Sequence, residues 1–307
     1  MTTASSRDAN RGALHHLSER WGSAIASLGI ACAMLLAWHV ATLPPRFDPS
    51  GRSADELTLL EFNGDIVRSA DGSYVANPEK LNGFPGPLAV LDKAIEELSD
   101  PFHKRGTNDH GIGLLVLYTV ARFSAGFLIA SLVAVGLGLF VGLSPGVYRA
   151  LSPFVNVLKP ISPLAWMPVL LYTVQSPTWT AILVVFMASL WPTLANTAFG
   201  VSAIRKDYLQ VAHILELPPW RRVLTVAIPA TAPAIVAGLR ISFGSALVAV
   251  VPAEMLLGDL GVGYLTWIEW NNLDIAGVLF AIAVVGCVGT LLDFALTRLS
   301  AAVSYAD

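Results

Sequence analysis

The stretch LQVAHILELPPWRRVLTVAIP (residues 209–229) lies between two long apolar runs, yet it is amphipathic, charged and broken by two adjacent prolines. Asp207 can cap a helix here, and the apolar positions that follow predict a short helix running to Leu217. Pro218 and Pro219 then end it, because proline cannot continue a helix. The sequence therefore predicts a short helical segment that is distinct from the apolar runs on either side.

The polar face of this predicted helix indicates what it contacts. A helix that lies on a lipid surface carries Lys and Arg along its polar face. Here the polar positions are Gln210, His213 and Glu216. The pattern therefore favours a protein partner over a lipid surface.

The composition of the whole chain places the apolar runs in a bilayer. Of its 307 residues, 54% are hydrophobic and only 13% are charged, and the mean hydropathy is +0.62. A soluble domain usually has about 25% charged residues, and a helix needs roughly 20 apolar residues to cross the hydrocarbon core. We therefore expect an all-α integral membrane protein with six transmembrane helices, at 22–43, 120–143, 152–174, 178–200, 230–252 and 275–297.

The distribution of Lys and Arg predicts the orientation of these helices. Cytoplasmic loops collect basic residues, and the loops at 175–177 and 255–274 contain no Lys or Arg at all. Both termini are therefore expected in the cytoplasm. The charged tail and the length of the first run favour a retained anchor over a cleaved leader, and the net charge of −3 argues against a nucleic-acid partner.

The same pattern divides the chain into segments. The long external segment contains a hairpin-like stretch at 62–77, with turn signals, and a helical apolar period at 88–102 that ends at a proline. This segment is interpreted either as a cap that packs on the spans or as a surface that docks a partner. The expected division is a cytoplasmic tail (1–21), a first transmembrane helix (22–43), a periplasmic segment (44–119), a five-helix core (120–300) with a cytoplasmic loop at 205–229, and a C-terminal tail (301–307).

Small residues crowd the second predicted span. Gly138 and Gly142 have the GxxxG spacing, and Ala134 and Gly136 lie close by. In lipid, such residues allow two helix backbones to approach closely. We expect packing within the subunit rather than a function of their own.

Charged residues inside spans are candidates for function, because each costs roughly 2.5 to 3.5 kcal/mol at a helix centre. Lys159 lies among prolines that break the helix, Arg240 lies near the middle of the fifth span, and Glu254 lies near its outer end. With Trp166, they are the candidate residues of a translocation pathway. The alternatives are that Lys159 reaches the cytoplasmic surface, that Arg240 pairs with carbonyls or an acid, and that Glu254 has a structural pairing role.

A polar and aromatic belt follows the fifth span. Tryptophans at such positions are often interface anchors. The belt can also border an outer gate or contact a binding protein, and its candidate residues are Trp267, Glu269, Trp270, Asn271 and Asn272.

Sequence motifs for bond chemistry are absent. The chain has no GxxxxGK[ST] phosphate loop, no HExxH, no CxxC pair and no GxSxG, and its six His are scattered. Cys32 and Cys287 both fall in predicted spans, where they behave as small apolar residues. We therefore expect no catalytic residue, no metal site and no bound cofactor, and energy for any work must come from a partner.

The opening stretch resembles the cytoplasmic loop of ABC importer membrane subunits. That loop begins Glu-Ala-Ala, has a glycine six residues after the Glu, and closes with Leu-Pro or Ile-Pro. Here 210–212 falls on the first three positions, Glu216 on the glycine, and Ile228-Pro229 on the close. Because Glu216 is not a glycine, we expect no positive φ there, and we expect the bend to come from Pro218-Pro219.

The resemblance covers most of residues 84 to 300 and extends to a branch of the family. The stretches FPGPLAVL, ISPLAWMPV, LWPTLANTAFGV, AEMLLGDLGVGYL and EWNNLD look like the nitrate, nitrite, cyanate or bicarbonate importers, next to the taurine and alkanesulfonate importers. The resemblance implies a type I ABC importer permease fold with a small periplasmic insert. It also implies that the loop is a coupling helix seated on an ATPase, with contact residues Asp207, Tyr208, Gln210, Val211, Ala212, His213, Glu216, Leu217, Trp220 and Arg221.

The resemblance further implies partners and a mechanism. Expected partners are a second copy of the chain, two ABC ATPase subunits that hold ATP and Mg, a periplasmic binding protein and a small anion, nitrate first. The expected site of action is the bacterial inner membrane and the mechanism is alternating access. The rival interpretations are a stand-alone secondary transporter or channel and, within the family, a taurine or sulfonate permease.

Overall fold

The computed structural model describes residues 22, 25–43, 51–68, 72–76 and 84–303. The chain divides into two units, Met1–Ala94 and Ile95–Asp307, and each is described by itself. The predicted tail at 1–21 and the last residues of the predicted C-terminal tail lie outside the described residues.

The first unit contains an apolar helix and a small insert. The helix Ile25–Ala41 is anchored at its end by Trp38, whose Nε1 donates to the Pro85 carbonyl at 3.1 Å. In the insert, β1 (Ile66–Arg68) pairs antiparallel with β2 (Tyr74–Ala76), which confirms the predicted hairpin. The helix α2 (Ala54–Phe62), which we did not predict, begins at a reciprocal capping box between Ser53 and Glu56.

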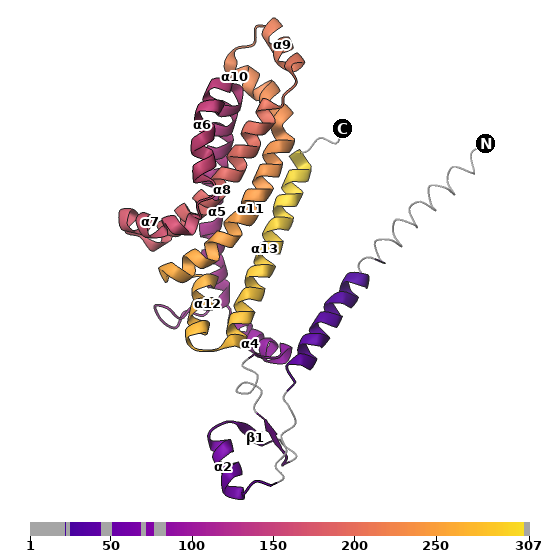
Figure 1. The fold of residues 1–307 in the computed structure, drawn as a ribbon, viewed down its shortest axis with the longest axis vertical. Coiled ribbons are helices and arrows are strands. Elements are labelled where there is room, and N and C mark those ends of the chain that lie inside the picture. Colours follow the sequence, from indigo (N-terminus) through magenta and orange to yellow (C-terminus); the bar gives the residue numbers. More distant parts are fainter. Residues whose placement is uncertain (1–21, 23–24, 44–50, 69–71, 77–83, 304–307) are drawn as a thin grey trace, which may run out of the picture. The chain divides into compact units, whose positions relative to one another are not determined.

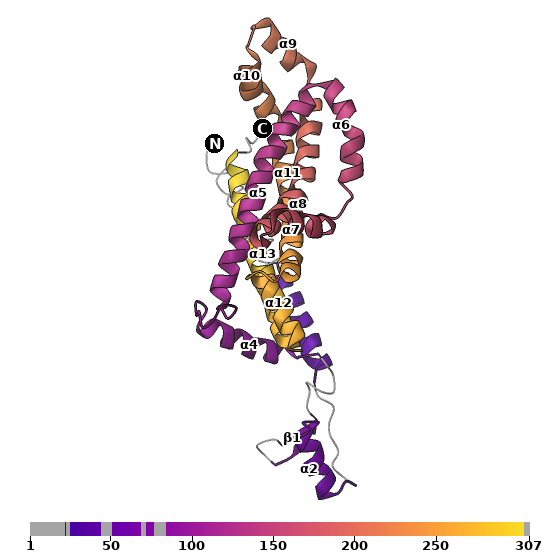
Figure 2. The same cartoon turned by 90° about the vertical axis from the view of Figure 1, so that its left-hand side faces the viewer.

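The second unit is helical. It is entered through α4 (Pro87–Ser99), the helix predicted before the proline stop, which begins in the first unit. Figures 1 and 2 show its long helices, among which α8 packs against both α5 and α11. The elements that follow are α5 (Ile112–Leu143), α6 (Pro145–Leu158), η1 (Pro163–Trp166), α7 (Met167–Val174), α8 (Pro177–Ser202), α9 (Lys206–Ile214), α10 (Pro219–Arg222), η2 (Val223–Ala227), α11 (Ile228–Leu257), α12 (Val262–Asn271) and α13 (Ile275–Val303).

The core of this unit lies where α5, α8 and α11 meet. Phe123 and Phe127 of α5 stack at 5.7 Å between ring centroids, and Phe243 of α11 meets both edge-on. Val185 of α8 belongs to the same buried cluster. Edge-to-face aromatic pairs of this kind stabilise a fold by more than their buried area alone accounts for. The cluster therefore holds α5, α8 and α11 together, and these helices position the polar groups at their ends.

Glycines set the close approach of α5 to α8. A Cβ added at Gly138 would lie 2.6 Å from the Cβ of Thr197, and one added at Gly142 would lie 2.5 Å from the Cβ of Val201. This confirms that the GxxxG pair packs within the subunit. At Gly136, by contrast, an added Cβ would meet nothing within 4 Å.

We expect Gly138→Val to destabilise the protein and Gly136→Val, its matched control, to change little. Valine at 138 must push α5 away from α8, and overpacking of this kind costs about 1 to 3 kcal/mol. Equilibrium unfolding in mixed detergent micelles measures the difference. Equal stabilities of the two variants would contradict the packing of α5 on α8.

The third predicted span, at 152–174, is not one continuous helix. The chain bends by 83° between 146–158 and 163–174. Pro160 and Pro163 explain the break, because each removes a backbone donor and restricts its neighbour. The proline-rich stretch was itself predicted to break the helix, and that prediction is confirmed.

Four helices are long and apolar enough to cross a membrane, or five if the bent pair counts as one span, within the described residues. The helix Ile25–Ala41 is shorter than these, so the sixth span remains a prediction. The span at Pro219–Leu257 is 39 residues long, which corresponds to about 58 Å of helix. Because the hydrocarbon core is about 30 Å thick, part of this helix must extend beyond it.

Candidate functional site

The first candidate site is the 205–222 loop, which follows α8 and contains α9 and α10. Its helix α9 ends at Ile214, which corrects the predicted end at Leu217. The reason is Glu216, which adopts a positive φ of 49° where none was expected. The Leu217 N–H then reaches back to the Ala212 carbonyl at 3.2 Å, the 6→1 bond of a Schellman cap.

The bend of the loop therefore uses both Glu216 and the prolines. Pro218 is extended, with φ −63° and ψ 151°, and α10 starts directly after it. At the other end, Asp207 lies in the first turn of α9 rather than capping it, and its carboxylate accepts from Arg205 at 2.9 Å.

The 205–222 loop exposes several large apolar side chains alongside charged ones. Ile214 is 79% exposed, Leu215 64% and Trp220 60%, and Tyr208 is also exposed. Ala212 is instead buried, and the side chains of Val211 and His213 lie outside what the structure describes. Exposed apolar side chains that lie together are typical of a surface that contacts a protein or a membrane.

Glycine at 216 is expected to be tolerated better than any β-branched residue. An L-residue in the left-handed region costs about 1 to 2 kcal/mol, which Glu216→Gly removes. We expect that variant to retain transport and to slow amide hydrogen exchange in 206–217, and Glu216→Val to speed it. Faster exchange in the glycine variant would contradict the Schellman cap.

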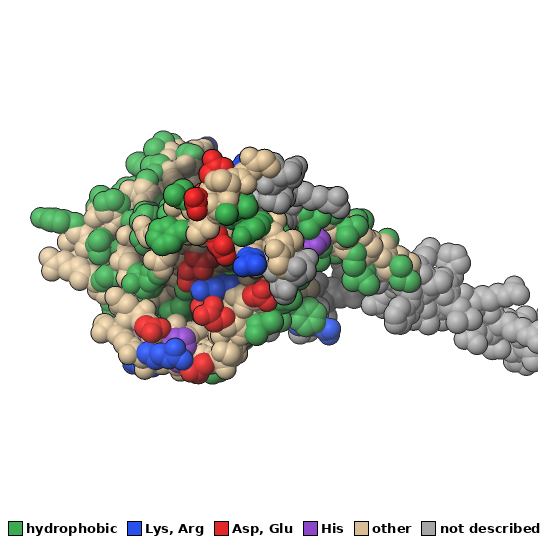
Figure 3. Space-filling model, turned by 90° about the horizontal axis from the view of Figure 1, so that it is seen from below, with side chains coloured by type: hydrophobic (Ala, Val, Ile, Leu, Met, Phe, Trp, Pro, Cys, Tyr) green, Lys and Arg blue, Asp and Glu red, His purple; other side chains and the backbone are tan. Residues whose placement is uncertain are grey.

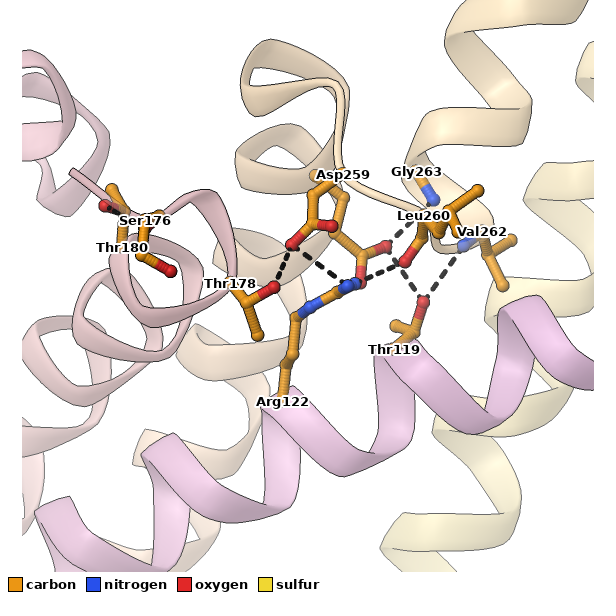
Figure 4. A network of polar contacts seen from close by, with 10 residues as sticks. Thr119, Arg122, Ser176, Thr178, Thr180, Asp259, Leu260, Val262 and Gly263 are labelled. Carbon is orange, nitrogen blue, oxygen red and sulfur yellow. Dashed lines mark hydrogen bonds and ion pairs between the residues drawn. The ribbon is translucent and has the colours of Figure 1, made fainter. Parts of the chain in front are cut away.

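The second candidate site is a buried polar network at the other end of the helices (Figure 4). Arg122 of α5 lies at its centre, and one guanidinium nitrogen donates to Glu254 at 2.8 Å while the other is 3.0 Å from Asp259. The same guanidinium donates to the Leu260 carbonyl. Thr178 at the start of α8 donates to Asp259 at 2.6 Å, so the network joins α5, α8, α11 and the turn before α12.

The second oxygen of Glu254 is bonded as fully as the first. Thr119 donates to it at 2.8 Å and the Gly263 N–H at 3.1 Å, while Thr119 in turn accepts from the Val262 N–H at 2.9 Å. Glu254 is completely buried. A buried carboxylate is tolerated only when it is paired and hydrogen-bonded in this way.

The glycines around Glu254 permit this approach. A Cβ on Gly261 would clash with the Glu254 carboxyl group, and one on Gly263 would lie 2.9 Å from the Glu254 Cβ. The GDLGVG stretch thus lets the turn after α11 fold back on the end of its own helix. The sequence reasoning missed Arg122, Asp259 and Thr119, although an arginine inside an apolar run was a signal for Arg122.

The remaining pathway candidates line two cavities. Lys159 lines a cavity of about 440 Å³ between the broken third span, α8 and α11. Arg240 lines one of about 670 Å³ between α11, α12 and α13, and its Nη2 donates to Thr297 at 3.0 Å. Trp166 ends η1 and is partly buried outside both linings. Glu254 lies in the polar network rather than on either cavity wall.

The belt after α11 is split by the fold of α12. Trp267 and Trp270 are exposed, as are Asn271 and Asn272, and Asn271 donates to the Trp267 carbonyl at 2.6 Å. Glu269 is buried and lies against Gly277 of α13, where an added Cβ would be 2.8 Å from its carboxyl carbon. Figure 3 shows acidic side chains interspersed with basic ones on the face that it draws.

Comparison with known proteins identifies the family. Residues 134–305 match the family model of the binding-protein-dependent transport system inner membrane component. The chain is 35% identical over 242 residues to the nitrate import permease protein NrtB of Synechocystis sp., covering 79% of this chain and 85% of the relative. It is also 35% identical to the bicarbonate transport system permease protein CmpB of Synechococcus elongatus, covering 68% and 77%.

A solved structure shows the same fold. A chain of the MetNI methionine ABC transporter in an inward-facing conformation aligns with a TM-score of 0.52 at 17% identity, covering 63% of this chain and 98% of that one. The matched permease domain carries no ATPase site of its own. The chain therefore belongs to the binding-protein-dependent inner membrane components and is a multi-pass permease subunit of an ABC importer.

Proposed function

We propose that this permease imports a small inorganic anion, nitrate or bicarbonate, as a homodimer driven by two ATPase subunits. The relatives named for nitrate and bicarbonate import support this class of substrate. Membership of the family removes the alternative of a stand-alone secondary transporter or channel.

The observation that carries the proposal is the set of exposed apolar side chains on the 205–222 loop, Tyr208, Ile214, Leu215 and Trp220. The loop's helices α9 and α10 lie at one end of the long helices, and α12 lies toward the other (Figure 1). The sequence holds no phosphate loop, so work at the membrane must be supplied through such a surface. We assign α9 and α10 as the segment that contacts the ATPase.

The orientation follows from this assignment. An ATPase contact at 205–222 places that loop in the cytoplasm, with both termini on the same side of six spans. The opposite end of the helices then lies on the periplasmic side. This end contains the GDLGVG turn, the buried polar network and the exposed tryptophans of α12. There a binding protein delivers the anion to an outer gate.

The mechanism is alternating access. Closure of the ATPase pair on ATP moves the two 205–222 loops together, and the helices joined to them open outward. Hydrolysis returns them to the inward-open state. The long segment Pro219–Leu257 suits this role, because it runs without a gap from the loop to Glu254 of the network.

The test is uptake by the assembled complex in proteoliposomes. We expect ATP-dependent uptake that requires an ATPase and a binding protein, and ATPase stimulation by the binding protein loaded with nitrate or bicarbonate. Stimulation by taurine alone would replace the anion assignment with the sulfonate one. Transport without any ATPase subunit would overturn the proposal.

A further inference from the structure

The cavity beside Lys159 differs in its lining from the larger cavity beside Arg240. It lies where the broken third span leaves α8 and α11 without a continuous helix beside them, and its volume is about 440 Å³. The share of one water in the liquid is about 30 Å³, so the space admits a small ion together with part of its hydration shell.

The lining supplies a single cation and several hydrogen-bond donors. Within the described part of the chain, Lys159 is the one charged residue on the wall. Ser162 and Trp191 also line the cavity, and their hydroxyl and indole N–H groups can donate to an anion. Ser245 lines it as well, but its hydroxyl already donates to the Ile241 carbonyl at 3.2 Å. The structure gives the Lys159 ammonium no acidic partner among the described residues.

The larger cavity differs in its charge. Arg240 and Asp293 both line it, so its wall carries one charge of each sign. Arg240 is also bonded to Thr297. An anion there would lie near the Asp293 carboxylate as well as the guanidinium. Like charges repel each other more strongly away from water, so the carboxylate would weaken anion binding.

The two cavities lie next to each other along α11. Gly244 and Val248 line both of them. An added Cβ at Gly244 would meet nothing within 4 Å, so this position leaves open space on the exposed face of α11. An ion at Lys159 would therefore lie beside α11, which is one of the helices that move in the proposed mechanism.

We propose that the Lys159 cavity is a binding site for a monovalent oxyanion within the membrane domain, and that Arg240 does not form part of it. This inference rests on the proposed function, since it assigns the place where the imported anion pauses. Lys159 supplies the charge, and Ser162 and Trp191 supply hydrogen-bond donors that replace water. The shared ligand chemistry is a compact oxygen-bearing anion, from either an inorganic or a sulfonate source.

The test is equilibrium binding to the purified full-length chain in nanodiscs. The probes are radiolabelled bicarbonate and radiolabelled taurine, each with unlabelled nitrate as competitor. We expect one probe to bind and Lys159→Met to weaken that binding at least tenfold. Lys159→Arg should restore it to within threefold, and Arg240→Met, the matched control, should change it less than twofold.

Other outcomes overturn the inference. Equal affinity of the wild type and Lys159→Met would remove the site, as would a loss in Arg240→Met as large as that in Lys159→Met. Binding of neither probe, with no competition by nitrate in the millimolar range, would also remove it.

Failure of the site and failure of the proposed function can be told apart. The second measurement is ATPase activity of the Lys159→Met chain assembled with its ATPase and binding protein. Suppose that Lys159→Met binds the anion as the wild type does, and that the binding protein still stimulates ATP hydrolysis by the complex. The assignment of the anion site to Lys159 is then wrong, and the proposed function stands. If anion binding follows Lys159 but no ATPase assembles with the chain, the site stands and the proposed function falls.

Discussion

Ile214→Asp is expected to lower ATP-driven uptake at least 20-fold while leaving the membrane helices folded. Among the side chains of the 205–222 loop that the structure describes, Ile214 is the most exposed apolar one, at 79%, so its replacement disturbs no internal packing. In the proposed complex it is an apolar anchor, and truncation of such an anchor costs 2 kcal/mol or more, roughly a 30-fold change in affinity. A charge buried in the same contact adds a desolvation cost. Uptake in proteoliposomes and the amount of co-purified ATPase measure the effect.

The matched control is Ala203→Asp. Ala203 is exposed and follows α8, outside α9. We expect this variant to bind the ATPase and to transport normally. If both variants transport at the wild-type rate, α9 is not the contact, and the assignment of the cytoplasmic face fails with it.

Ala212 shows why exposure must guide the choice of variant. The family resemblance implies that it contacts the ATPase, yet its side chain is only 1% exposed. An aspartate at 212 would place a charge without a partner inside the loop, so it acts through loop stability. The loss of uptake in Ala212→Asp would therefore be accompanied by faster hydrogen exchange in 206–217, whereas Ile214→Asp would leave that exchange unchanged.

Much of the fold could be predicted because the bilayer acts on runs of residues. An uncharged run in hydrocarbon forms a helix because a helix satisfies all backbone hydrogen bonds within the segment. Hydropathy alone therefore placed α8 within two residues of its observed ends. The hairpin in the insert was predictable for another local reason, since alternating residues and Asp71-Gly72 favour a tight turn between strands.

The site was harder to predict because its contacts are not local. Arg122 and Glu254 are 132 residues apart in the chain, and no spacing rule connects them. The end of α9 was predicted three residues too late, because Pro218 is a strong stop signal and the left-handed Glu216 has no signature in its own side chain. Local strain of this kind becomes visible only when the surrounding packing is known.

Arg122→Met is expected to be among the most destabilising single changes in the chain, at about 3 to 5 kcal/mol. It leaves the fully buried Glu254 without its counter-ion, and it also deprives Asp259 of a partner 3.0 Å away. Removing one member of a buried ion pair has this cost because the other charge stays buried and uncompensated. Arg298→Met is the control, since Arg298 is exposed and a surface change of this kind falls within about 0.5 kcal/mol. Equilibrium unfolding by SDS titration of the detergent-solubilised protein measures both.

The double variant Arg122→Met with Glu254→Met tests whether the two side chains contribute to the free energy of unfolding as a pair or independently. If charge burial dominates, the double variant is more stable than Arg122→Met alone, because no uncompensated carboxylate remains in the core. Thr119 and the Gly263 N–H then lose their acceptor, which keeps the double variant below the wild type by about 1 to 3 kcal/mol. Strictly additive losses would mean that Arg122 and Glu254 act independently. In that case the network could not hold the turn after α11 against α5, and the C-terminal part of α11 would be fixed by the Phe123, Phe127 and Phe243 cluster instead.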